Sequence, residues 1–245
     1  MKARFEIVFS MAAFGTIAVF VRNIGLPSGE VALYRAVIAA LALFLWQLCT
    51  RQTVRWQDVK KELPLLFVSG AAMSVNWILL FEAYKYTTVA MATLSYYFAP
   101  VIVTVASTVL FREGLTAKQI SCFVMSTLGL VMVIGVSGGG GSHDLLGILL
   151  GLGAAVFYAA VVLINKGIRR VSGLNRTFLQ FIAAILVMMP YVCLTGGSHL
   201  GSLDLAGTVN LLVVGIFHTG VCYCIYFSSL RYLRGQEASI LSYID

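Results

Sequence analysis

The stretch "FEAYKYTTVAMATLSYYF" at 81–98 returns in altered form as "FSSLRYLRGQEASILSYI" at 227–244. A constant offset of 146 residues (227 − 81) superimposes a Phe, two Tyr and an Ala of the two segments. Carried upstream, the same offset places Trp77 on Tyr223. The chain therefore contains an internal repeat, which must be recognised before any fold is assigned.

A second match extends the repeat toward the N-terminus. "VIAAL" at 37–41 aligns with "FIAAI" at 181–185, with an offset of 144 residues (181 − 37). The repeat unit then holds five apolar segments. Because five is odd, the second copy is expected to cross a membrane in the opposite direction. Inverted-topology repeats of this kind are typical of alternating-access transporters, whose sites lie between the two copies.

The composition indicates a membrane protein. Of the 245 residues, 60% are hydrophobic and 11% are charged, whereas a soluble domain has about a quarter charged residues. The net charge is +7, but its basic residues are dispersed between apolar segments. That placement fits topology signals of a protein in a lipid bilayer better than a phosphate-binding patch, so no nucleic acid is expected as a partner.

Eight apolar segments approach the ~20 residues that a membrane-spanning helix needs. They cover 5–21, 30–49, 64–84, 88–111, 118–136, 145–164, 177–195 and 205–230, and a ninth begins near Gln236. Backbone groups in lipid must bond internally, so helices are the expected spanning elements.

The predicted fold is an all-α, polytopic helix bundle of two inverted five-helix repeats. It would have ten spans when complete, with eight and part of a ninth here. The first repeat is expected at 1–136, a Gly-rich outer connector at 137–144, and the second repeat at 145–245. The first copy continues from Pro100 for a further helix and a half, so we expect the natural protein to continue in the same way.

The basic residues predict the orientation. With the N-terminus in the cytoplasm, every one of the 17 Lys and Arg lies in a cytoplasmic segment except Arg22, Arg35 and Lys85. This distribution follows the positive-inside rule. A multi-pass membrane protein with its N-terminus in the cytoplasm is therefore expected.

The five cysteines make no C-x-x-C pattern, and they indicate neither a disulfide framework nor a zinc site. Cys222 lies four residues after His218, on the same helix face, but no third ligand is evident. No metal and no cofactor are predicted.

Four segments resemble the EamA-like family of the drug/metabolite transporter superfamily. They are "LYRAVIAALAL", "NWILLFEAYKYTTVAMATLSYYFAPVIVTV", "FREGLTAKQ" and "YFSSLRYLRGQEASILSYID". The resemblance implies ten helices in two inverted halves, a bacterial inner membrane, and export or uptake of small metabolites. It does not imply one substrate.

Polar and aromatic side chains inside the spans are candidates for substrate binding, because polar groups are costly there. His218 can bind substrate or carry a proton, or it is a neutral imidazole bonded to a neighbouring helix. Asn76, Trp77 and Tyr223 lie at equivalent depths of the two copies, which favours a role in binding. The alternatives are helix–helix bonding by Asn76 and ordinary packing by the rings.

The fourth expected span contains Tyr97 and Pro100. Pro100 removes a backbone hydrogen bond and predicts a helix break, and broken helices line transporter sites. The alternative is a packed kink. Tyr158 and Phe14 can complete an aromatic box, although aromatic residues at helical spacing are more often part of the core.

Arg35 and Glu82 lie toward the outer ends of their spans and are expected to act as a gate or in coupling. A direct ion pair between them would latch the outer side. Alternatively Arg35 extends to lipid headgroups, and Glu82 pairs with Lys85 one turn on.

These features predict a secondary, alternating-access transporter of small organic metabolites or drugs. Export is favoured, and proton coupling or exchange is left open. An intramembrane enzyme is the first rival, but no carboxylate pair for acid–base chemistry is apparent. A channel or scaffold is the second. Gly147 and Gly151 allow close helix contact, either within the chain or in a homodimer.

Overall fold

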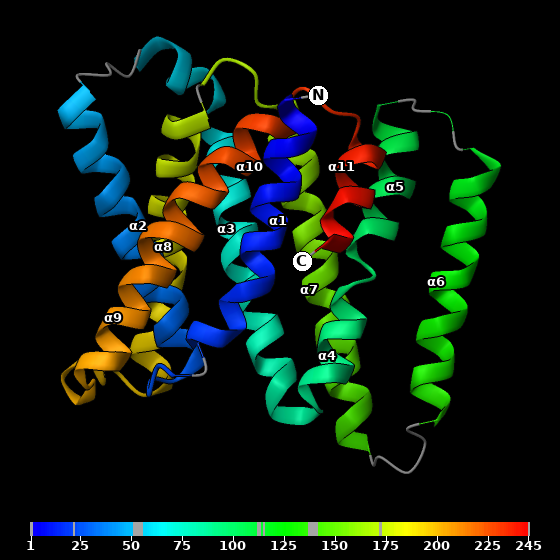
Figure 1. Ribbon diagram of the computed structural model, residues 1–245, viewed down its shortest axis with the longest axis horizontal. Coiled ribbons are helices and arrows are strands. Elements are labelled where there is room, and N and C mark those ends of the chain that lie inside the picture. Colours follow the sequence, from blue (N-terminus) through cyan, green and yellow to red (C-terminus); the bar gives the residue numbers. More distant parts are fainter. Residues whose placement is uncertain are drawn as a thin grey trace.

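Seven helical segments of the described chain are long and apolar enough to cross a membrane, and the computed structural model sets them side by side (Figure 1). The structure describes residues 2–21, 23–50, 56–111, 114, 116–136, 142–171 and 173–244. No strand occurs within these ranges. The expected all-α membrane bundle is thereby confirmed at the level of its helices.

Some sequence-based expectations fall outside these ranges. They include Arg22, Arg51, Arg55 and Arg112 of the charge count, and most of the expected Gly-rich connector.

The elements follow one another as long helices and short half-length pieces. They are α1 (Lys2–Val21), α2 (Ser28–Thr50), α3 (Trp56–Tyr86), α4 (Val89–Tyr96), α5 (Ala99–Leu110), α6 (Ala117–Val136), α7 (Ser142–Gly167), α8 (Gly173–Thr195), the 3-10 helix η1 (Leu200–Ser202), α9 (Leu205–Val213), the π-helix η2 (Val214–Val221), α10 (Cys222–Leu230), α11 (Gly235–Leu241) and the 3-10 helix η3 (Ser242–Ile244).

Each of the eight expected spans falls on one helix or on two or three consecutive helices. The largest difference is in α3, which begins at Trp56, well before the expected start at 64. Pro64 lies inside this helix. The apolar pattern alone could not reveal the polar first turns of α3, because they lie outside the apolar run.

Two spans are composite. The span at Leu205–Leu230 consists of α9, η2 and α10. The span at Val89–Leu110 divides into α4 and α5 at a turn formed by Tyr97 and Phe98, and Pro100 opens α5. The expected break therefore exists. The chain turns just before Pro100, at positions whose amides bond back to Thr93 and Ser95.

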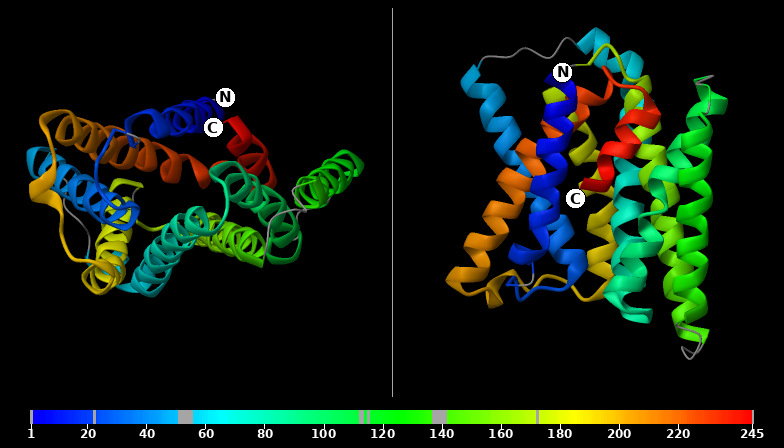
Figure 2. Two further views of the ribbon diagram at one scale, coloured as in Figure 1. Left: turned by 90° about the horizontal axis from the view of Figure 1, so that it is seen from below. Right: turned by 45° about the vertical axis from the view of Figure 1, so that its right-hand side comes forward.

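The start of α4 and the start of α11 have the same backbone geometry. Thr88, the N-cap of α4, has φ −67° and ψ 150°, and Arg234, the N-cap of α11, has φ −67° and ψ 149°. The offset between them is 146 residues (234 − 88), which is the sequence repeat. The two half-helices start at opposite ends of the bundle and both run toward its middle (Figures 1 and 2).

Glycines bring several helices into close contact. A Cβ on Gly147 would lie 2.5 Å from the Thr87 side chain, and one on Gly151 would lie 2.9 Å from the Ala92 carbonyl oxygen. These two of the glycines in α7 therefore pack within the chain, against the start of α4. This is the first of the two roles expected for them.

The outward faces of the helices are apolar. In α2, Leu41, Leu45, Trp46 and Leu48 are each more than half exposed. A surface of this kind suits lipid rather than water. The helix α6 stands at one edge of the bundle, farthest from α2 (Figure 1).

Candidate functional site

An aromatic cluster gathers around Tyr223 of α10, in the middle of the bundle. Its ring centroid lies 4.9 Å from that of Phe14 in α1, 5.8 Å from that of Phe181 in α8 and 6.2 Å from that of Trp77 in α3. The repeat equates Trp77 with Tyr223, and the fold brings these two rings into edge contact. We call these four residues, together with Tyr158, Tyr226 and Arg35 described below, the central cluster.

Tyr158 of α7 joins the central cluster through Tyr226 of α10. Their hydroxyl oxygens are 3.0 Å apart, and the ring of Tyr226 lies 6.4 Å from that of Phe14. On its other side, the ring of Tyr158 lies 5.6 Å from that of Tyr96 at the end of α4. The cluster therefore receives side chains from both expected copies.

Tyr97 has a different position from the other predicted binding residues. It forms the C-cap of α4 at the helix break, and its ring lies 6.4 Å from that of Tyr96. Pro100 is buried at the start of α5. Both residues thus belong to the break beside the central cluster.

Arg35 of α2 lies over Trp77. The guanidinium carbon is 4.1 Å from the centroid of the indole, the geometry of a cation–π contact. Arg35 is only 8% exposed, and its Nε is buried without a hydrogen-bond partner. The hydroxyl groups of Tyr84, Tyr96 and Tyr223 lie within electrostatic range of it.

Asn76 joins two helices. It is buried, and its Nδ2 donates a 2.7 Å hydrogen bond to the carbonyl oxygen of Ala154 in α7. This is the helix–helix role that the sequence left open for Asn76. The bond fixes the neighbouring Trp77 relative to α7.

His218 lies in η2 and faces α1. Its Nε2 is 3.0 Å from the hydroxyl of Thr16, and its ring lies 5.1 Å from that of Phe20. Its Nδ1 is buried without a hydrogen-bond partner. The structure thus shows the interhelical bond that was one of two interpretations of His218, and it places this side chain beside α1 rather than against Trp77.

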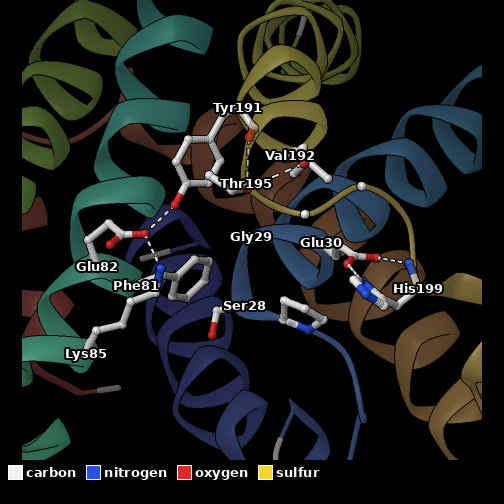
Figure 3. Close-up of a pocket in the computed structure, with 13 residues that line it drawn as sticks. Ser28, Gly29, Glu30, Phe81, Glu82, Lys85, Tyr191, Val192, Thr195 and His199 are labelled. Carbon is white, nitrogen blue, oxygen red and sulfur yellow. Dashed lines mark hydrogen bonds and ion pairs between the residues drawn. The ribbon is translucent and has the colours of Figure 1, made fainter.

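A pocket lies at one end of the bundle, where α2 begins and where α3 and α8 end (Figure 3). It encloses about 100 Å³. Glu82 projects into it, accepts a 2.6 Å bond from the Lys85 ammonium and also bonds the Tyr191 hydroxyl. We call it the terminal pocket.

The second acid of the terminal pocket is Glu30, which is 3% exposed. Its carboxylate accepts a 2.8 Å bond from the backbone amide of His199 and lies 2.6 Å from Nδ1 of the same residue (Figure 3). This pair attaches the segment after α8 to the start of α2.

The ion pair between Arg35 and Glu82, one of the two arrangements that the sequence left open, is absent from this structure. Glu82 bonds Lys85 and Tyr191, whereas Arg35 contacts Trp77. Lys85 lies one turn from Glu82 on the same helix, so its ammonium pairs with the Glu82 carboxylate in place of Arg35. The alternative pairing of Glu82 with Lys85 is the one observed.

The central cluster lies deeper than the terminal pocket. Arg35 follows Glu30 by five residues in α2, and Trp77 precedes Glu82 by five residues in α3. At 1.5 Å per residue, both steps correspond to about 7.5 Å along the helix axis. The two helices therefore lead from the pocket to the Arg35–Trp77 contact.

Sequence reasoning missed the role of Arg176. It was expected as a loop charge, but α8 begins before it and Arg176 is fully buried. Its guanidinium donates four hydrogen bonds to backbone carbonyl oxygens, those of Asn165, Ile168, Val171 and Phe227. Asn165 and Phe227 lie in the last turns of α7 and α10, where carbonyls lack helical partners.

Glu62 of α3 binds the same loop from the other side. Its carboxylate accepts hydrogen bonds of 3.0 to 3.1 Å from the backbone amides of Arg169, Arg170 and Val171. The α7–α8 loop is thus held by a cation on its carbonyls and by an anion on its amides. The partners of Arg176 and Glu62 are backbone groups, which every residue has. The sequence therefore could not indicate this arrangement.

A buried polar network crosses three helices and was also missed. Asn165 and Gln180 each donate a 2.9 Å bond to the hydroxyl of Ser69, and Gln180 also bonds Oδ1 of Asn165. These residues link α3, α7 and α8. Spacing along one helix could not have identified it, because each helix supplies one member.

Among the described residues, no group of three or more His, Cys, Asp and Glu side chains is placed to hold a metal ion. Cys222 is fully buried in the helix turn after His218.

The family model for the EamA-like transporter family matches residues 2–135 and 145–245. Two curated relatives cover nearly the whole chain. An uncharacterized transporter, YxxF, of Bacillus subtilis strain 168 is 32% identical over 98% of this chain and 77% of its own length. An uncharacterized transporter of Archaeoglobus fulgidus is 28% identical over 98% of this chain and 82% of its own length.

A solved crystal structure has the same fold. It matches with a TM-score of 0.73 at 15% identity, over 98% of this chain and 84% of the other. At this identity, the match speaks for the arrangement of the helices alone.

Proposed function

Because the chain belongs to the EamA-like transporter family, we propose that it carries small organic metabolites or drugs across a cell membrane by alternating access. The two family matches fall on the two expected copies, and the named relatives are transporters. These findings support a multi-pass membrane transporter, and they point away from the rival enzyme.

One observation carries the proposal. Trp77 and Tyr223, which the repeat equates, contact each other with ring centroids 6.2 Å apart. In transporters built from inverted repeats, the substrate lies where the two copies meet. The central cluster occupies such a position, with Phe14 and Trp77 from one copy and Phe181 and Tyr223 from the other.

The proposed cycle moves the two halves about the central cluster. The half-helices α4 and α11, which start at opposite ends of the bundle (Figure 1), support an inverted arrangement of ten spans. Export is the direction that we propose, driven by proton entry or by solute exchange. Glu82, the titratable side chain bonded to Lys85 and Tyr191 in the terminal pocket, is the first candidate for coupling.

Replacement of Trp77 or Tyr223 by alanine is expected to reduce solute counterflow about tenfold. Each change removes one wall of the central cluster, and aromatic contacts of this kind contribute about 0.5–1.5 kcal/mol beyond the area they bury. The measurement is saturable counterflow of a metabolite panel in proteoliposomes. Trp46→Ala is the matched control, because Trp46 is 58% exposed on the outward face of α2.

Two results would contradict this proposal. One is wild-type transport that rises linearly with solute concentration and shows no counterflow, as in a channel. The other is a loss of counterflow in Trp46→Ala as large as that in Trp77→Ala.

Single cysteines at positions 85 and 231 are expected to react from opposite sides of the membrane. Lys85 and Arg231 lie at equivalent positions of the two copies, where one helix is joined to the next, and both side chains are exposed. The C-terminal ends of α3 and α10, beside which they lie, are at opposite ends of the bundle (Figure 1). Impermeant maleimide on intact cells should label Lys85→Cys, and Arg231→Cys only after lysis. Labelling of both from outside would refute the inverted arrangement.

A further inference from the structure

Arg35 and Arg176 are the buried arginines among the residues that the structure describes, and their positive charges have different surroundings. Arg176 is fully buried and donates to four carbonyl oxygens at the ends of α7 and α10 and in the α7–α8 loop. Helix C-termini carry partial negative charge, so they compensate a cation there. Arg35 sits in the first half of α2, far from that helix's C-terminus.

Arg35 has no hydrogen bond and no ion pair to any residue that the structure describes. Its Nε is fully enclosed, and the whole side chain is more than nine-tenths buried. A buried cation without a counter-charge costs several kcal/mol. Ionisable groups inside a membrane protein are for this reason functional candidates by default.

The nearest acids along the helices are already engaged. Glu30 bonds His199, and Glu82 bonds Lys85 and Tyr191. Neither carboxylate balances Arg35 in this arrangement. The positive charge of Arg35 is therefore available to a ligand.

The contact with Trp77 suits such a ligand. The guanidinium carbon lies over the indole, 4.1 Å from its centroid, and a guanidinium held against one aromatic ring still has N–H donors that are directed away from it. Hydroxyl groups of Tyr84, Tyr96 and Tyr223 lie within electrostatic range of the same charge. A fork of N–H donors matches the two oxygens of a carboxylate.

We propose that Arg35 is the anion-binding group of the central cluster, and that the carried solute bears one carboxylate beside an apolar or aromatic arm. A single guanidinium balances a single negative charge, which favours a monocarboxylate over a phosphate dianion. The rings of Phe14, Phe181 and Tyr223 offer apolar surface to the arm. This inference rests on the proposed transport function and names its substrate class.

The test is a binding measurement on the full chain in detergent. Trp46 and Trp56 are replaced by phenylalanine, so that Trp77, beside Arg35, is the reporting fluorophore. Phenylacetate, its neutral counterpart phenylacetamide, phenethylamine and inorganic phosphate are titrated separately. We expect phenylacetate to bind saturably, with an apparent affinity about tenfold or more above that of phenylacetamide, because charge-assisted hydrogen bonds are worth that much.

Arg35→Gln should abolish the preference for phenylacetate, and Arg35→Lys should retain part of it. Arg170→Gln, at an exposed arginine, should retain all of it. Should Arg35→Gln fail to fold, the comparison of acid with amide in the unmodified site still decides. Equal binding of acid and amide, no saturable response to the acid, tighter binding of phosphate, or a preference retained in Arg35→Gln would each overturn the proposal.

The same titrations separate this inference from the transport proposal. Selective acid binding without counterflow would leave the anion site standing and remove the carrier. Counterflow of neutral or cationic solutes without acid binding would leave the carrier and remove the anion site.

Discussion

Arg176→Met is expected to lower the apparent melting temperature of the detergent-solubilised protein by about 6–12 °C. The substitution keeps the apolar stem but removes the donors to four carbonyl oxygens. Buried groups left without a partner cost about 1–3 kcal/mol each. Some of the four carbonyl oxygens will bond water at the end of the bundle. We therefore expect the free energy of unfolding to fall by roughly 3 kcal/mol, which corresponds to that temperature shift.

Arg176→Lys should restore little of this stability. A lysine ammonium is a compact group that cannot span carbonyls on α7, α10 and the intervening loop as the planar guanidinium does. The matched control is Arg170→Met, six residues earlier, whose side chain is exposed. Equal melting temperatures for the methionine variants at 176 and 170 would show that the buried guanidinium stabilises nothing.

Gly70→Val is expected to abolish most of the folded protein. A Cβ on Gly70 of α3 would lie 2.4 Å from the carbonyl oxygen of Gln180 and 2.6 Å from Cβ of Ala183, both in α8. The first of these atoms is backbone, so a rotamer change cannot relieve the clash. The two helices would have to separate, and overpacking costs typically about 1–3 kcal/mol and occasionally more.

The separation would also disturb the hydrogen bonds that join α3 to α8. Ser74 donates a 3.0 Å bond to the carbonyl oxygen of Ala184, and Gln180 bonds Ser69. The yield of monodisperse protein in size-exclusion chromatography measures the effect. Gly129→Val in α6 is the control, since a Cβ there would meet nothing within 4 Å. Similar yields of the two valine variants would refute the close contact.

The sequence predicted the features that depend on the length of an apolar segment, on a proline within it or on the internal repeat. The bounds of the last complete span, expected at 205–230, agree with Leu205–Leu230. The helix break near Pro100 is also present. Both features follow from residues along one segment. The repeat placed Trp77 and Tyr223 at equivalent positions, but it did not predict that their rings contact each other.

The sequence alone could not predict which groups on different helices contact each other. Arg35 and Lys85 were both candidate partners of Glu82, and the structure shows Lys85 together with Tyr191 of α8, which the sequence did not indicate. Arg176 seemed a loop residue because it immediately precedes an apolar run, and its backbone partners leave no mark in any side-chain pattern. The π-helix was likewise invisible, since its residues are as apolar as those of the α-helices around it.

The π-helix η2 changes which residues of one span face the same neighbouring helix. In a regular α-helix, two residues that are five positions apart point about 140° away from each other. A π-turn bonds residue i to residue i+5, which brings such residues toward the same side of the axis. His218 accordingly contacts Thr16 and Phe20 of α1, and Tyr223, five residues further on, contacts Phe14 of the same helix. The widened turn thereby lets an imidazole and a phenol share one neighbour that regular winding would give to only one of them.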